Sequence, residues 1–265
     1  MPIGFASASV AGTRLSSGLQ SYHSVGNMIH QYVLFWVMLL LAAGEAVAAN
    51  PQALFNGKNL TGWDGNPGIW SVADGAIIGR TTAEAPIAKN TFLIWRGGEL
   101  GDFRLQVQYR IQGGNSGVQY RSHVVDPAKW IVGGYQADID SGTTYTGILY
   151  EELGRGILTL RGQKVTIAAD GTRTAATFAD AAELQKSIRA NDWNDYVIEA
   201  RGERLRHWIN GKLMSETVDA ERDKRAEKGV LALQVHAGPP MTVQYRKIVL
   251  EPLDANSPDY EPPQR

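Results

Sequence analysis

The 265-residue sequence contains no cysteine. This absence excludes disulfide bonds, thiolate metal sites and thiol catalysis, and it leaves no cysteine to carry a lipid. Histidine is also scarce, because only His123, His207 and His236 follow the first 48 residues. No glycine-rich phosphate loop and no Gly-x-Ser-x-Gly motif is present. The usual nucleotide-binding and serine-hydrolase signatures are therefore missing.

An excess of charge of either sign is also lacking, with 26 Lys and Arg against 27 Asp and Glu. The chain therefore carries no basic footprint of a nucleic-acid-binding protein, and no nucleic-acid partner is expected. We expect no cofactor either, although the acidic residues would suit a divalent metal such as calcium.

The longest apolar run, Val33 to Ala43, has eleven residues, whereas a membrane-spanning helix needs about 20. Ala46-Val47-Ala48 follows as a small-x-small cleavage site. Residues 1–48 are therefore predicted to be a leader, with Met28 as an alternative start. The mature protein is expected in the periplasm or secreted, without a stable membrane anchor. The alternative interpretation is a single membrane anchor.

Alternating apolar and polar residues dominate the rest of the chain. From Phe103 to Ile111 every second residue is apolar, which predicts a half-buried strand. Asn210-Gly211 lies between two apolar stretches and predicts a hairpin turn. Only 179–188 and 219–228 carry a helical signal. The second is a charged run with almost no apolar face, so a solvated connector is the favoured interpretation there. We expect an all-β sandwich or jelly roll over residues 49–254 and a loose tail over 255–265.

Polar side chains occupy the non-core face of several predicted strands. These rows contain Gln, Arg, Asp and His but no Lys. Planar groups with fixed hydrogen-bond geometry are suited to binding the hydroxyl groups of a ligand. If the strands are neighbours, the rows form one polar platform; the alternative is an ordinary solvated face. The rows are Gln106, Gln108 and Arg110; Gln119 and Arg121; Gln136, Asp138 and Asp140; Gln234 and His236; Gln244 and Arg246.

Asp138 and Asp140 lie two residues apart, so one strand face would hold their Cα atoms roughly 6.5–7 Å from each other. Two carboxyl groups that close can have different pKa values, and one then acts as acid and the other as base. Two alternatives remain: pairing with Arg121 or Arg161, or a calcium site.

Three further candidates lie outside this pair. Glu152, in the segment Tyr150-Glu151-Glu152, is a catalytic candidate, although pairing of either glutamate with Arg155 is the commoner outcome. His236 ends a polar row before a loop and suits a general acid or base, with a structural histidine as the alternative. Trp130, in a polar segment, is the candidate for stacking on a sugar ring.

An ordered series of motifs resembles the 3-keto-disaccharide hydrolase family from Leu54 to Leu253. The series runs Leu54 to Trp63, Trp70-Ser71-Val72, Asp102-Phe103, Gly114 to Gly117, Tyr120-Arg121, Gly134-Tyr135, Thr146-Gly147, Tyr150, Trp193-Asn194, Asn210-Gly211 and Gly229 to His236.

The resemblance implies a concanavalin-like jelly roll of two antiparallel sheets with a concave polar face. It also implies action on glycosides oxidised at C3, by C2 proton abstraction, elimination and hydration. Asp138, Asp140, His236 and Glu152 are then the catalytic candidates. Those for binding the carbohydrate are Arg110, Gln119, Arg121, Gln136, Tyr150, Gln234 and Trp130, with Arg121 or Arg110 at the enolate oxygen.

One departure from the family concerns Gln136 and Asp138, which stand where the family usually has Glu and then Gln after Gly-Tyr. The amide and the acid have exchanged places along the strand. A non-catalytic carbohydrate-binding module on the same fold is the alternative function, and a structural domain of an outer assembly is a third.

Overall fold

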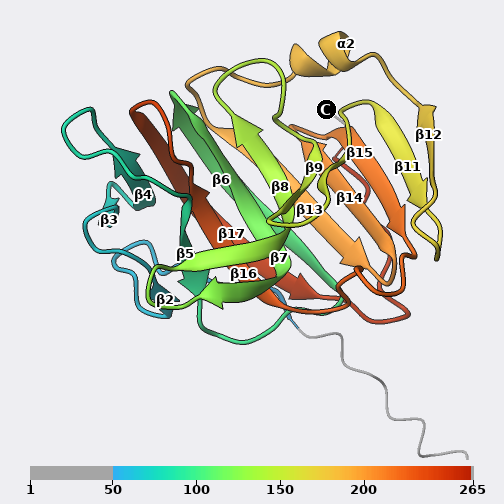
Figure 1. The fold of residues 1–265 in the computed structure, drawn as a ribbon, viewed down its shortest axis with the longest axis horizontal. Coiled ribbons are helices and arrows are strands. Elements are labelled where there is room, and N and C mark those ends of the chain that lie inside the picture. The colour runs from blue at the N-terminus through green and yellow to red at the C-terminus, as the bar shows by residue number, and fades with distance from the viewer. Residues whose placement is uncertain (1–49, 264–265) are drawn as a thin grey trace, which may run out of the picture. The chain divides into compact units, whose positions relative to one another are not determined.

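The computed structural model describes residues 50–263, and it folds them into two packed β-sheets (Figure 1). Nearly all strand pairs are antiparallel; β11 and β15 are parallel. The larger sheet runs in the order β12 (Arg173–Thr177), β11 (Gln163–Ile167), β15 (Lys212–Asp219), β14 (Arg204–Ile209), β13 (Asn194–Arg201), β6 (Phe103–Gln112), β17 (Met241–Pro252), β4 (Ala76–Thr81) and β3 (Trp70–Ala73), with β1 (Gln52–Ala53) beside β17. The smaller sheet runs β10 (Gly156–Thr159), β9 (Leu149–Glu152), β8 (Ile131–Asp140), β7 (Asn115–Asp126), β16 (Val230–Val235), β5 (Thr91–Trp95) and β2 (Trp63–Asp64). These two sheets confirm the predicted all-β jelly-roll sandwich.

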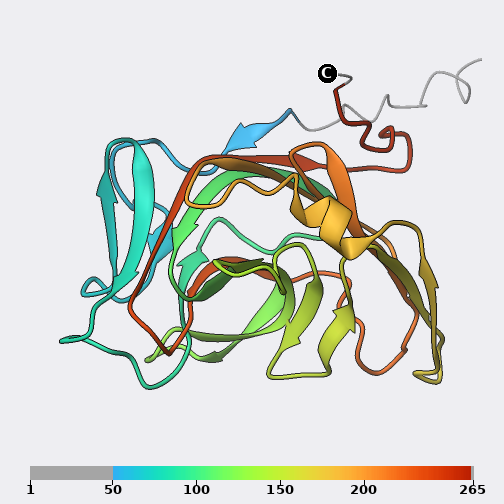
Figure 2. The ribbon, with the colours of Figure 1, turned by 90° about the horizontal axis from the view of Figure 1, so that it is seen from above.

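Figure 2 shows the two sheets as stacked layers, and the hydrophobic core lies between them. Alternate residues of each strand enter it, so Tyr135, Ala137 and Ile139 of β8 are buried against the inner face of the larger sheet. The core is rich in tyrosine, a residue that buries a large ring but needs a partner for its hydroxyl group. The tyrosines with almost no exposed surface are Tyr109, Tyr120, Tyr135, Tyr196 and Tyr245.

The Asn210-Gly211 turn joins β14 to β15, with φ angles of 49° and 79°. Positive φ at both positions is the geometry that the right-handed strand twist requires in a two-residue hairpin, so the hairpin prediction is confirmed. The helix expected over 179–188 is reduced to α2 (Ala181–Gln185), whose N-cap Asp180 accepts hydrogen bonds from two backbone amides. The second region, beyond Asp219, is turn and loop without a helix.

The predicted polar rows do not all lie on one sheet. Strands β7, β8 and β16 are neighbours in the smaller sheet, whereas β6 and β17 belong to the larger one. There the rows pair with each other, because Arg110 donates to Gln244 (2.7 Å) and Arg246 to Gln108 (2.8 Å). The prediction of one platform is therefore wrong for β6 and β17, and only the rows of the smaller sheet are neighbours.

Part of the predicted tail is held against the larger sheet. Arg104 donates to the Pro258 carbonyl (2.6 Å), Arg204 pairs with Asp259 (2.6 Å), and the Tyr260 ring packs on Trp208 with centroids 5.0 Å apart. The tail segment 258–260 is therefore anchored to the larger sheet. Within residues 50–263, no helix has the length and apolarity needed to cross a membrane. The predicted leader, residues 1–48, lies outside the described residues.

Candidate functional site

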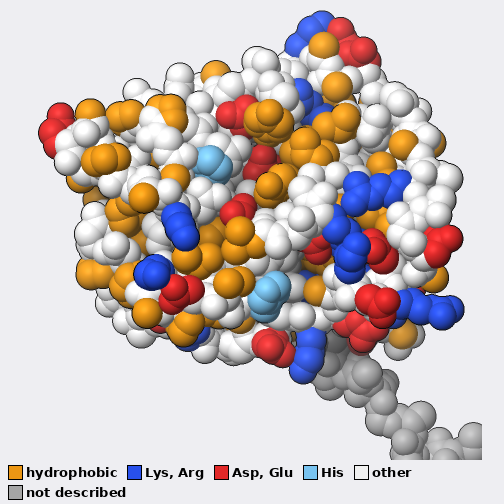
Figure 3. All heavy atoms as spheres, viewed as in Figure 1, with side chains coloured by type: hydrophobic (Ala, Val, Ile, Leu, Met, Phe, Trp, Pro, Cys, Tyr) orange, Lys and Arg blue, Asp and Glu red, His pale blue; other side chains and the backbone are white. Residues whose placement is uncertain are grey.

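A polar hollow of about 260 Å³ lies on the outer face of the smaller sheet, over β7 to β10. Figure 3 shows this face, with acidic and histidine side chains set among apolar ones near its middle. The hollow is lined by Asn90, Asn115, Gln136, Asp138, Tyr145, Ile148, Tyr150, Glu152, Ile157 and His236. None of these residues is a lysine or arginine.

Asp138 lies in the hollow, on β8, with 5% of its surface exposed. Gln136 Nε2 lies 2.7 Å from its Oδ1, and Asn115 Nδ2 lies 3.2 Å from its Oδ2. Burial raises the pKa of Asp138, the two amides act against it, and the nearby charges of Asp140 and Glu152 act with it, so that the pKa is about 7. A carboxyl group with this pKa can hold or release a proton near neutral pH.

Glu152 and His236 complete the set of titratable groups in the hollow. Glu152 accepts hydrogen bonds from Asn90 (2.9 Å) and Gln234 (3.2 Å). Nδ1 of His236 lies 2.5 Å from the Ala237 carbonyl oxygen. A carbonyl oxygen only accepts, so Nδ1 carries the hydrogen and Nε2 is the basic nitrogen of the neutral ring.

Tyr150, on β9, supplies a hydroxyl group to the hollow. Partial burial raises its pKa, and the neighbouring charges of Glu152 and Asp138 act in the same direction. The hydroxyl therefore stays protonated and can donate a hydrogen bond to a negatively charged oxygen. Ile148 and Ile157 give the hollow an apolar wall, which suits the C–H face of a sugar ring.

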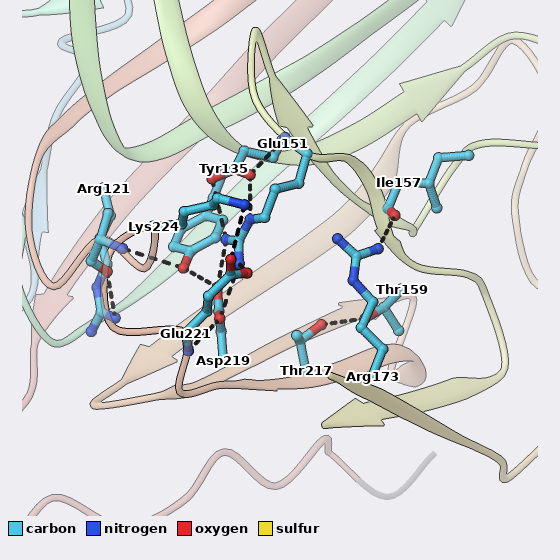
Figure 4. A network of polar contacts seen from close by, with 12 residues as sticks. Arg121, Tyr135, Glu151, Ile157, Thr159, Arg173, Thr217, Asp219, Glu221 and Lys224 are labelled. Carbon is cyan, nitrogen blue, oxygen red and sulfur yellow. Dashed lines mark hydrogen bonds and ion pairs between the residues drawn. The ribbon is translucent and has the colours of Figure 1, made fainter. Parts of the chain in front are cut away.

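The two adjacent glutamates of β9 face opposite ways, because successive side chains of a strand alternate. Glu151 points inward and binds Arg155 (2.6 Å), which also binds Asp219 (2.6 Å) and Glu221 (2.8 Å). Figure 4 shows Glu151, Asp219 and Glu221 converging, with Tyr135 beside them. The predicted pairing with Arg155 thus involves Glu151 and leaves Glu152 in the hollow.

The other amides of the predicted rows lie next to the hollow. Gln119 of β7 stands directly opposite Gln136 across the strand pair and contacts its amide (2.9 Å). Gln234 of β16 reaches Glu152. Asp140 lies at the end of β8, outside the hollow, where its carboxylate accepts from the Tyr145 backbone (3.4 Å). The two predicted aspartates therefore do not share the site.

Arg121 does not reach the hollow, and a β-bulge explains why. The register between β7 and β8 shifts between Tyr120 and His123, and Arg121 has a φ of 46°. Such a bulge breaks the alternation of side chains along a strand. The guanidinium instead binds Asp102 (2.7 Å) and the carbonyls of Gly101 and Gly202, so its predicted place on the polar face is corrected.

Arg110 and Trp130 are also outside this hollow. Arg110 belongs to the larger sheet and stacks over Trp193, 5.0 Å from the ring centroid. Trp130 donates to Asp64 (2.7 Å) and lines a separate hollow of about 470 Å³. That hollow shares Asn90 with the polar one.

A wider hollow of about 700 Å³ adjoins the polar hollow and shares Asn90 and Glu152 with it. Its lining is mainly apolar and includes Leu153 and Val125, which are 66% and 49% exposed. Exposed apolar side chains beside a polar pocket are typical of ligand grooves.

Sequence reasoning missed five lining residues: Asn90, Asn115, Tyr145, Ile148 and Ile157. Asn115 had a signal, since it belongs to the Gly-Asn-Ser-Gly motif and forms the start of β7 rather than a turn. Asn90 precedes β5 and reaches the site only through the fold. Within residues 50–263, no three His, Asp or Glu side chains cluster as metal ligands would. The expectations about calcium and cofactors stay predictions.

Several known proteins resemble this chain in sequence or in fold. Residues 50–251 match the model of the 3-keto-alpha-glucoside-1,2-lyase-like domain. A crystal structure of a candidate glycosyl hydrolase from Parabacteroides distasonis ATCC 8503 is 19% identical, with a TM-score of 0.52 over 77% of this chain and 100% of that one. The carbohydrate-binding module CBM66 from Bacillus subtilis is 16% identical, with a TM-score of 0.48 over 72% and 95%. At such identities the first likeness shows the fold alone. No curated protein matches the sequence significantly.

Proposed function

The chain belongs to the family of 3-keto-alpha-glucoside-1,2-lyase-like domains, and we propose that it cleaves 3-keto-glycosides by elimination followed by hydration. The observation that carries the proposal is Asp138, a buried carboxyl group with a pKa raised to about 7 that lies in a polar hollow. A group of this kind is suited to moving a proton near neutral pH.

The C3 ketone acidifies the C2 proton of the sugar. A base removes that proton, the electron pair forms the C1–C2 double bond by way of the enolate, and the C1–O bond breaks. The leaving oxygen takes a proton from an acid. Water then adds at C1 and a proton returns to C2, which gives the free 3-keto-sugar and the alcohol. The reaction therefore needs a base, an acid and a hydrogen-bond donor at the enolate oxygen.

The hollow contains a group for each of these tasks. His236, with Nε2 as the basic nitrogen, and Glu152 are the candidate bases, and Asp138 is the candidate acid. The protonated Tyr150 hydroxyl and the Asn115 amide are the donors for the enolate oxygen. They take the place expected for Arg121 or Arg110, which lie elsewhere.

The two adjoining hollows would hold different parts of the substrate. The polar hollow of about 260 Å³ suits one keto-sugar ring, and the adjoining hollow of about 700 Å³ would take the leaving group. Glu152 and Asn90 line both, so the scissile bond would lie beside them.

The test is release of product from a 3-keto-disaccharide by the purified chain in D₂O. Elimination and hydration place deuterium at C2 of the product, whereas direct hydrolysis keeps hydrogen there. Asp138→Asn should lower the turnover at least about a hundredfold. The matched control is Asp170→Asn, an isosteric change in the exposed turn between β11 and β12, and it should match the unmodified chain.

Three results would count against parts of the proposal. Equal turnover by the two variants would remove Asp138 from proton transfer. Product without deuterium at C2 would replace elimination by direct hydrolysis. Saturable sugar binding without turnover would favour a carbohydrate-binding module instead.

A further inference from the structure

Two glutamine side chains form a chain of amides next to Asp138. Gln119 has no exposed surface and Gln136 is almost fully buried. The two face each other across β7 and β8. Their amides lie 2.9 Å apart, and the far end of the Gln136 amide lies 2.7 Å from Asp138 Oδ1. The orientation of each amide therefore fixes that of the next.

In one orientation every amide nitrogen points toward Asp138, which suits an ionised carboxylate. The oxygen of Gln119 then lies 3.0 Å from the Tyr135 carbonyl oxygen and 3.2 Å from that of Gly134. Only the Ser122 hydroxyl, 2.7 Å away, donates to it. Oxygen facing buried oxygen is unfavourable, because none of them has a hydrogen to share.

In the opposite orientation the Gln119 nitrogen occupies this place and donates to both carbonyls. Its oxygen then faces Gln136, whose amide must turn as well so that its nitrogen donates. The Gln136 oxygen consequently lies beside Asp138 Oδ1, and two oxygens at 2.7 Å need a proton between them. Every group in the chain is then satisfied only if Asp138 is protonated.

We propose that Gln119 and Gln136 are positioning residues that hold Asp138 in its protonated form, and that Asp138 is therefore the proton donor of this site. The protonation state follows from the amide chain alone, whereas the role as donor to the leaving oxygen rests on the proposed function. Asn115 completes the arrangement, because it donates to the second oxygen of the acid.

The surrounding backbone restricts how the two glutamine side chains can move when Asp138 gains or loses a proton. A Cβ atom at Gly117 would lie 2.5 Å from Cγ of Gln136, so the glutamine packs directly on bare backbone. The amide can turn about its last bond, but the side chain has little room to move away. When Asp138 gives up its proton, both amides must turn, and the Gln119 oxygen then meets the two carbonyls. This opposition favours recovery of the proton after each turnover.

Two substitutions distinguish the effect of the two amides on the pKa of Asp138 from a general packing effect. Gln119→Met keeps the shape but frees Gln136 to donate to Asp138, so the pKa of Asp138 should fall by about one unit or more, which is at least tenfold in proton affinity. Ser122→Ala removes the only donor to the Gln119 oxygen in the ionised arrangement, so the same pKa should stay or rise. A carbon-13 NMR titration of the Asp138 carboxyl group in the free protein measures both.

An unchanged pKa in Gln119→Met, or an equal fall in Ser122→Ala, would overturn the inference. Neutron diffraction of the unmodified protein at pH 5.5 provides a test that needs no variant. Deuterium between Gln119 and the carbonyls of Tyr135 and Gly134 is expected, and deuterium between Gln119 and an oxygen of Gln136 would contradict it. If the predicted titration is found but no 3-keto-glycoside is cleaved, the proposed function fails and the amide chain stands.

Discussion

Asp138→Asn should make the protein more stable at alkaline pH although it removes a functional group. The pKa of Asp138 is raised from 3.8 to about 7. The folded state therefore binds this proton more tightly than the unfolded state does. The proton contributes its full stabilisation below the unfolded pKa, and that contribution is lost as the pH rises through about 7.

The size of the effect follows from the two pKa values. At 1.36 kcal/mol per pKa unit, their difference corresponds to about 4 kcal/mol at pH 8 and above. Asparagine cannot ionise, and in the amide orientation proposed above its nitrogen can donate to the Gln136 oxygen in place of the protonated acid. The variant should therefore exceed the unmodified chain in free energy of unfolding by up to about 4 kcal/mol at pH 8. The gap should be narrower by roughly 2.5 kcal/mol at pH 5.

Urea denaturation of both proteins at several pH values between 5 and 8 measures this gap. Asp170→Asn is the control, since the lowered pKa of this exposed carboxylate leaves it ionised in both states over that range. A gap for Asp138→Asn that stays constant with pH would refute the reasoning, because the carboxyl group would then titrate alike in the folded and unfolded chain.

Three other substitutions test the surroundings of the site. Asp219→Asn removes one of the three carboxylates that bind the buried Arg155 and weakens the hydrogen bond from Tyr135, so it should cost about 1.5–3 kcal/mol in urea denaturation at pH 7. Since the pKa of Asp219 is lowered, the loss should shrink as the pH falls below about 4, and an unchanged midpoint at pH 7 would contradict it. Gly117→Ala places a Cβ 2.5 Å from Gln136 and should cost about 1–3 kcal/mol in thermal denaturation together with most of the turnover; full activity would show that the amide is not held in place. Glu152→Gln turns an amide toward two donors and should lower kcat/KM at least about tenfold; an unchanged value would remove Glu152 from the reaction.

The sequence was informative wherever local periodicity decides the outcome. Strict alternation from Phe103 to Ile111 predicted β6, and the Asn210-Gly211 pair predicted the β14–β15 hairpin. The same alternation placed Gln136 and Asp138 on one strand face, and both line the hollow. Period-two patterning works here because each strand has one face in the core.

The errors arose where position depends on long-range pairing or on local irregularity. Arg110 fits the alternating pattern, but its strand belongs to the other sheet, and strand adjacency leaves no mark in local sequence. Arg121 fits as well, yet a bulge with a φ of 46° turns it away. Asn90 and Tyr145 carry no pattern at all, since loops bring them to the hollow. Asp138 and Asp140 both belong to β8, but Asp140 is its last residue, and its carboxylate accepts from the Tyr145 backbone beside the strand end instead of lining the hollow.

The division of charges between the two faces of β9 explains why Asp138 stays protonatable. Arg155 lies on the inner side, where Glu151, Asp219 and Glu221 neutralise it. On the outer side, the hollow around Asp138 is lined by amide, hydroxyl and apolar side chains together with Glu152 and His236, and by no lysine or arginine. A guanidinium within about 4–6 Å would favour the ionised carboxylate and lower its pKa. The same strand thus uses one glutamate to bind the sheets together and keeps the other, with Asp138, in an environment where a proton can move.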